Sequence, residues 1–100
     1  MSFVTASNPL NAAFINPVET PDHMRFVVFA APDPGTLPRI VEPFAKRGLV
    51  PTCLNSRHSG DELRVEIEID GIDQSLAAYI GRCLLEMFVV RSVDLLSGSP

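Results

Sequence analysis

The stretch "ELRVEIEID", residues 62–70, decides the fold of this chain. Leu63, Val65, Ile67 and Ile69 are apolar, and every residue between and beside them is charged. Successive side chains of a β-strand point to opposite faces, so this alternation predicts a strand with one buried face and one charged face. Other elements of the chain must therefore cover the apolar face.

The residues on either side of this stretch predict a hairpin before it and a helix after it. "SGD" at 59–61 favours a turn from a second strand over 49–59, and Pro51 places that strand at a sheet edge because proline donates no hydrogen bond. Gly71 is expected to end the charged strand, and Asp73 to cap a helix. The buried stripe of that helix is expected at Leu76, Ile80, Cys83, Leu84 and Met87, followed by a last strand over 88–96.

The first half of the chain predicts a strand and a helix. "MRFVVFAA", residues 24–31, is apolar on both faces, which is typical of a central strand. Asp33 is expected to cap the next helix with Pro34 as its first residue, although Pro38 fits better if the helix begins at Thr36. Pro43 should remove one helical hydrogen bond, and Gly48 should end the helix. The apolar stripe is Leu37, Ile40, Val41 and Phe44.

The element order is strand, helix, strand, strand, helix, strand. It predicts an α+β, ferredoxin-like βαββαβ sandwich, in which two helices cover one face of a four-stranded antiparallel sheet. We expect an extended arm over residues 1–22, one domain over 23–97 and a tail over 98–100.

The composition indicates one cytoplasmic globular domain. The chain has 100 residues, of which 46% are apolar, and 12 acidic against 8 basic residues give a net charge of −4. The acidic balance argues against nucleic acid and anionic membranes as partners, and no apolar run is long enough to span a bilayer. Cys53 and Cys83 are expected to be buried free thiols, and their spacing predicts no metal site.

No enzyme and no cofactor are expected. His23 and His58 are the only histidines, and each is expected to be a solvated side chain rather than a catalytic base. An RNA-recognition motif would place aromatic and basic side chains where Glu66 and Glu68 lie. The loop at 31–37 lacks the paired cysteines of a copper chaperone and the arginine of an acylphosphatase.

The loop "DPGTL" at 33–37 and the helix phrase ending in "FAKRG" at 44–48 resemble the ACT domain family. The phrase is most similar to that of the small regulatory subunits of acetolactate synthase. The resemblance spans residues 24–96. It implies a non-catalytic regulatory module that binds a small effector, typically an amino acid. ACT domains commonly pair side by side, which implies a homodimer through the edge strand 49–58 and the first helix.

The resemblance also implies an effector site between the first loop of one chain and the second strand of its neighbour. The matching residues are Asp33, Gly35, Thr36, Leu37, Val50, Thr52 and Asn55. Gly35 either lets a ligand approach the backbone or simply permits a tight turn. Pro32 and Val50 replace asparagines of the valine-regulated subunits, and neither side chain can hydrogen-bond an effector.

Three hypotheses follow. In the first, the chain is a regulatory subunit held against the large thiamine-dependent subunit of acetolactate synthase, with the charged face or the arm making the contact. In the second, it is a homodimer that senses an amino acid on its own. In the third, it is a structural dimerisation module without a ligand.

Overall fold

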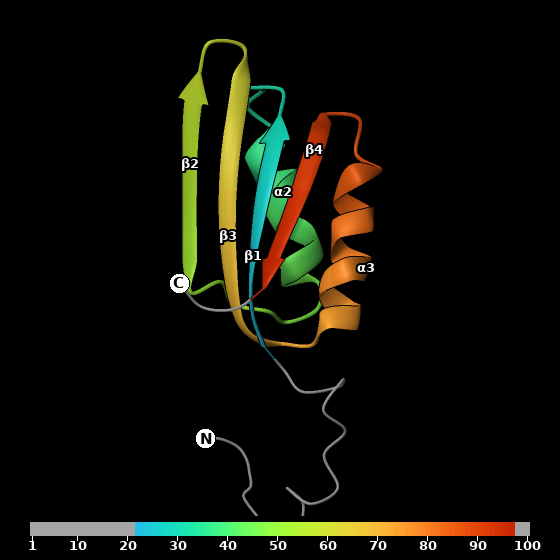
Figure 1. Cartoon of the computed structure of the whole chain (residues 1–100). Helices are drawn as coiled ribbons and strands as arrows, with labels where there is room; N and C mark the ends of the chain where they lie inside the picture. The colour runs from blue at the N-terminus through green and yellow to red at the C-terminus, as the bar shows by residue number, and fades with distance from the viewer. Residues whose placement is uncertain (1–21, 98–100) are drawn as a thin grey trace, which may run out of the picture.

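The alternating stretch forms β3, the longest strand of a four-stranded antiparallel sheet with the order β2-β3-β1-β4 (Figure 1). The structure is a computed structural model that describes residues 22–97, so the predicted arm, apart from Asp22, and the tail lie outside the described residues. The elements are β1 (Asp22–Ala30), α2 (Thr36–Ala45), β2 (Cys53–Ser59), β3 (Glu62–Ile72), α3 (Gln74–Leu85) and β4 (Val90–Ser97). The predicted βαββαβ order and fold are confirmed.

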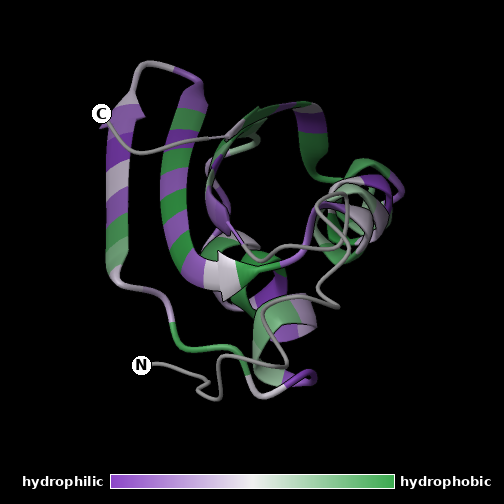
Figure 2. Cartoon of the chain, turned by 60° about the horizontal axis from the view of Figure 1, so that its bottom comes forward, coloured by the Kyte–Doolittle hydropathy of each residue, from purple (hydrophilic) through white to green (hydrophobic). Residues whose placement is uncertain are grey.

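The apolar face of β3 is buried as its alternation predicts. Val65 and Ile67 are fully buried and Ile69 is 1% exposed, whereas Leu63 is half-buried near the hairpin. Figure 2 shows the same alternation as hydrophobic and hydrophilic bands along the strand. Burying each of these side chains contributes about 1.5–3 kcal/mol, and a slip of one residue would expose them all.

Both helices pack on this apolar face. The core joins β1, β3 and the two helices, and the Phe26 ring meets the Phe44 ring of α2 edge to face with 4.9 Å between centroids. The prediction that β1 is a central strand is confirmed, since Val28 is fully buried on the helix side and Val27 is 5% exposed on the opposite side. We call that opposite, helix-free side of the sheet the open face.

The edge position of the second strand is confirmed, but the strand begins at Cys53 rather than at residue 49. Thr52 is its first anchored residue, because its N–H and its hydroxyl both donate to the Glu68 carbonyl, at 2.8 and 3.2 Å. All seven residues of β2 are exposed, and neither helix lies over it (Figures 1 and 2). The prediction that both cysteines are buried is therefore wrong: Cys53 is exposed on this edge and Cys83 is half-buried, both as free thiols.

The start of α2 also differs from the prediction. The helix begins at Thr36 with Gly35 as its N-cap, so Asp33 is not the cap and Pro34 is not its first residue. This start makes Pro38 a first-turn residue, where a missing N–H costs nothing. The helix continues through Pro43 and ends at Ala45, and its closing turn reaches Gly48, whose φ of +69° favours glycine.

The second half of the chain follows its prediction more closely. Asp73 caps α3, with its carboxylate accepting the Leu76 N–H at 2.7 Å. The strand before it runs on to Ile72, because Gly71 takes a φ of +75° next to a shift in the β1–β3 register instead of ending the strand. The last strand begins two residues later than predicted, at Val90, and leaves Phe88 fully exposed in the turn before it. No helix within residues 22–97 is long and apolar enough to cross a membrane.

Candidate functional site

The residues of the site that the sequence predicts fall into two groups, which begin from opposite ends of the sheet. β1 and β2 both run antiparallel to β3, so the loop after β1 and the segment before β2 lie at opposite ends of the sheet (Figure 1). The first group is Asp33, Gly35, Thr36 and Leu37, and the second is Val50, Thr52 and Asn55. A ligand that touches both groups must therefore bind between two chains.

The first group is held by the hydroxyl of Thr36. This side chain is fully buried, and its hydroxyl donates to the Ala31 carbonyl at 2.8 Å while accepting the Asp33 N–H at 3.3 Å. Both of its hydrogen-bonding functions are thus engaged within the loop, so Thr36 shapes the loop. Asp33 is exposed, and Leu37 packs against the core.

The start of α2 offers fewer unpaired backbone N–H groups than an uncapped helix without proline would. The Thr36 N–H donates to the Asp33 carbonyl and the Arg39 N–H to the Gly35 carbonyl, and Pro38 has no N–H. Among the described residues, the N–H groups of Gly35 and Leu37 have no hydrogen-bond partner. A carboxylate at this loop would be met by these two donors.

Gly35 keeps an ordinary backbone conformation, with φ of −86° and ψ of −2°. The turn therefore does not require glycine for its conformation. A Cβ placed on Gly35 would lie 3.6 Å from Cζ of Arg39, which is an ordinary contact. What glycine provides here is room for the Arg39 guanidinium beside the backbone.

Arg39 is a candidate site residue that sequence reasoning missed. Its guanidinium lies over Gly35, which gives a cation to a loop that has no basic residue of its own. The signal was the spacing of four residues on a helix whose side chains lean towards its N-terminus. A carboxylate at the two backbone donors would lie beside this guanidinium.

The second group is exposed along the edge strand. Val50 is 81% exposed, and Asn55 pairs in register with Glu66, which places it on the open face. Leu54 points to the helix side but is still 47% exposed, because no helix reaches β2. An apolar side chain beside an unpaired strand edge favours contact with another chain.

His23 forms a charged cluster on the open face. Its Nε2 lies 2.9 Å from Oε1 of Glu68 and its Nδ1 lies 3.4 Å from Oδ1 of Asp70. The hydrogen bond to Glu68 raises the pKa of His23 above its ordinary value, Asp70 adds to the rise, and partial burial acts against it. The prediction of a simply solvated His23 is therefore wrong. His58 is exposed, with its Nε2 2.9 Å from the Gly60 carbonyl.

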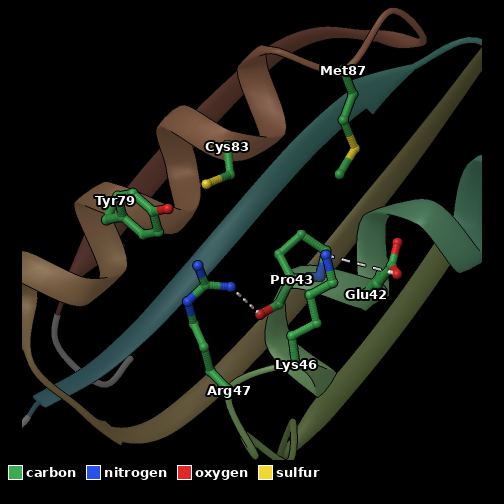
Figure 3. A pocket seen from close by; sticks show the side chains of 7 residues that line it. All are labelled: Glu42, Pro43, Lys46, Arg47, Tyr79, Cys83 and Met87. Carbon is green, nitrogen blue, oxygen red and sulfur yellow. Dashed lines mark hydrogen bonds and ion pairs between the residues drawn. The ribbon is translucent and has the colours of Figure 1, made fainter.

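A groove of about 250 Å³ separates α2 from α3 (Figure 3). Tyr79 and Cys83 line it from α3 and Met87 from the turn after α3, and Pro43 and Arg47 lie opposite on α2 and its closing turn. None of the residues of the predicted site lines it. Within residues 22–97, no three His, Cys, Asp or Glu side chains gather in a way that could hold a metal ion.

Comparisons with known proteins identify the family of this chain and solved structures with a similar fold. A family model described as an ACT-like domain matches residues 19–98. A search of curated proteins finds no match. The ACT domain from GTP pyrophosphokinase of Chlorobium tepidum superposes with a TM-score of 0.68, at 12% identity over 77% of this chain and 100% of that one.

Two further solved structures share the fold at low identity. The regulatory subunit of aspartate kinase from Thermus thermophilus, in a ligand-free form, has a TM-score of 0.58 at 15% identity, over 75% of this chain and 50% of that one. Prephenate dehydratase from Streptococcus mutans has a TM-score of 0.55 at 20% identity, over 79% of this chain and 43% of that one. At these identities the likeness concerns the fold alone.

Proposed function

Because the chain belongs to the ACT-like domain family, we propose that it is a non-catalytic regulatory module that binds an amino acid between two copies of itself. The copies pair through β2 and the neighbouring surface of α2. The observation that carries this proposal is the exposure of all seven β2 residues on an unpaired edge of the sheet. One of the similar structures is itself named a regulatory subunit.

The geometry of the first loop supports a carboxylate as the part of the effector bound there. The N–H groups of Gly35 and Leu37 and the guanidinium of Arg39 lie together at the start of α2. A charged hydrogen bond contributes roughly 1.5–3 kcal/mol. The partner chain would bring its Val50, Thr52 and Asn55 to the same ligand.

Thermal melting against the twenty amino acids tests this proposal. An effector at a hundred times its dissociation constant adds about 2.7 kcal/mol, a rise in Tm of about 10 °C or more for a domain of this size. Arg39→Gln should weaken binding about tenfold, which roughly halves the stabilisation to about 1.4 kcal/mol at the same effector concentration. Arg91→Gln, which removes the same charge from β4 at the opposite edge of the sheet, should leave the response unchanged. A flat response across the panel would instead favour a dimerisation module without a ligand.

The finer proposal is that the chain is the small subunit of acetolactate synthase, acting in branched-chain amino acid biosynthesis in the cytoplasm. It rests on the loop and helix phrases at 33–37 and 44–48. In this proposal the open face contacts the large subunit. It carries Glu66 and Glu68, both half-buried among charged neighbours. Glu66→Gln with Glu68→Gln should weaken co-purification with that subunit, and an unchanged yield would contradict this contact.

A further inference from the structure

The groove between α2 and α3 exists because a small side chain stands between two large ones. Tyr79, Cys83 and Met87 follow one another at intervals of four residues along one side of α3 and its closing turn, and Cys83 is the smallest of them. Figure 3 shows these side chains projecting towards α2, where the ring of Pro43 faces them. The hollow has an apolar and polarisable floor.

Arg47 is fixed at the side of this hollow. Its Nη1 donates to the Pro43 carbonyl at 3.0 Å, and its guanidinium carbon lies 4.9 Å from the centroid of the Tyr79 ring. The guanidinium carbon of Arg82 lies 5.8 Å from the same centroid, so the Tyr79 ring makes cation–π contacts with two arginines. A guanidinium has five N–H donors, and the bond to Pro43 uses one of them, so Arg47 is already oriented to receive an anion.

The rim of the groove carries two further charged side chains, the positive Lys46 and the negative Glu42. Nζ of Lys46 lies 4.0 Å from Oε2 of Glu42, and both side chains are more than half exposed. An exposed pair of this kind contributes little to stability, so a ligand can replace either partner at little cost. With Arg47, the groove has two positive charges and one negative charge.

We propose that this groove binds a small carboxylate with an apolar body. The carboxylate meets Arg47 and Lys46, and the apolar body lies on Cys83 and Met87. A volume of about 250 Å³ admits a molecule the size of an amino acid and excludes a nucleotide. Glu42 distinguishes an amino acid, whose ammonium it can bind, from a 2-oxo acid, which has none. The groove belongs to a single chain, so this inference does not depend on the proposed dimer.

NMR titration of the isotope-labelled chain with L-leucine, 4-methyl-2-oxopentanoate and L-leucinamide tests the inference. The two carboxylates should shift the amides of Arg47, Tyr79, Cys83 and Met87 with a dissociation constant of about a millimolar, because the groove is open and the ligand small. Leucinamide, which lacks the carboxylate, should not. Tighter binding of leucine than of the oxo acid identifies amino acids as the natural class, and the reverse identifies 2-oxo acids.

Variants separate this groove from the site proposed between two chains. Arg47→Gln should weaken binding about tenfold, and Cys83→Phe should remove it by filling the hollow with the charges intact. Arg39→Gln and Arg57→Gln should leave it unchanged. The inference is overturned if the groove amides do not shift up to the solubility limit, if leucinamide shifts them equally, or if Arg47→Gln and Cys83→Phe, both folded by their amide spectra, bind as the parent does.

Discussion

The side chain that fixes the start of α2 is Thr36 and not Asp33, and it acts on the preceding loop without capping a helical N–H group. Its buried hydroxyl bonds Ala31 and Asp33 and so fixes the loop that precedes the helix. Sequence patterns favour aspartate before a helix, and they could not reveal that a threonine inside the helix would turn back to the loop.

Thr36→Val should therefore destabilise the fold by about 1–3 kcal/mol. The change keeps the shape of the side chain but removes both hydrogen bonds of a fully buried hydroxyl, and it leaves the Asp33 N–H and the Ala31 carbonyl bonded only to each other, at 3.0 Å. Thr52→Val is the matched control, because its exposed hydroxyl donates to a carbonyl that also receives the Thr52 N–H, and it should cost under about 1 kcal/mol. Urea unfolding measures both, and equal losses would contradict the role given to Thr36.

Gly35→Ala separates folding from ligand binding. The backbone of Gly35 suits any residue and a Cβ would make an ordinary contact, so the free energy of unfolding should change by less than about 1 kcal/mol. The added methyl group would lie 3.6 Å from the Arg39 guanidinium carbon, in the space where the carboxylate is proposed to bind, so the rise in Tm with the effector should be lost. A variant that melts as the parent does and still responds fully would show that the ligand does not approach this backbone.

His23 should make stability depend on pH. Its pKa is raised in the folded chain, so its contribution is complete below about pH 6.5, the value for an unfolded histidine, and is lost as the pH rises through the folded pKa. NMR titration of the ring gives the folded pKa directly. Glu68→Gln should lower that pKa, and an unchanged titration would contradict the contact.

At the scale of elements, alternation in β3 predicted both the strand and its buried face. Ile67→Ala should cost about 2–5 kcal/mol, because Ile67 is fully buried among the helices. Glu66→Gln, one residue away on the open face, should cost less than about 1 kcal/mol although its carboxylate lies 2.6 Å from Arg64. Denaturant unfolding of both variants checks the assignment of faces, and similar losses would contradict it.

Element boundaries were predictable to within about four residues, and the exceptions have local causes. β2 starts late because Pro51 has no N–H to donate, so the bond from the Thr52 N–H to the Glu68 carbonyl comes first. Pro43 is tolerated inside α2, where it lines the interhelix groove and its carbonyl receives Arg47. Contacts of this kind join residues through three-dimensional packing, which local sequence patterns do not encode.

The candidate site was predictable only in part for the same reason. The loop phrase at 33–37 marked the right end of α2, but Arg39 joins it only through helical geometry. Glu68 and Asp70 reach His23 through a pairing of strands far apart in the sequence. The interhelix groove depends on the relative placement of two helices, which the pattern of each helix alone does not specify.

At the scale of the whole molecule, the fold leaves one margin of its sheet uncovered. The helices bury the sheet as far as β3, and β2 extends beyond them with Leu54 half-exposed. In the proposed dimer this margin pairs with its copy and brings the two groups of site residues together. Leu54→Lys should weaken such pairing, because it places like charges beside each other across the two-fold axis.

The proposed dimer with an amino acid bound between its chains is tested most directly by sedimentation equilibrium. The measurement is made with and without the amino acid found by thermal melting. We predict a reversible dimer that the amino acid tightens, because a ligand bound between two chains favours their association. Leu54→Lys should shift the equilibrium towards monomers at an unchanged circular dichroism spectrum. A chain that stays monomeric at every concentration reached, with and without the amino acid, would contradict the account.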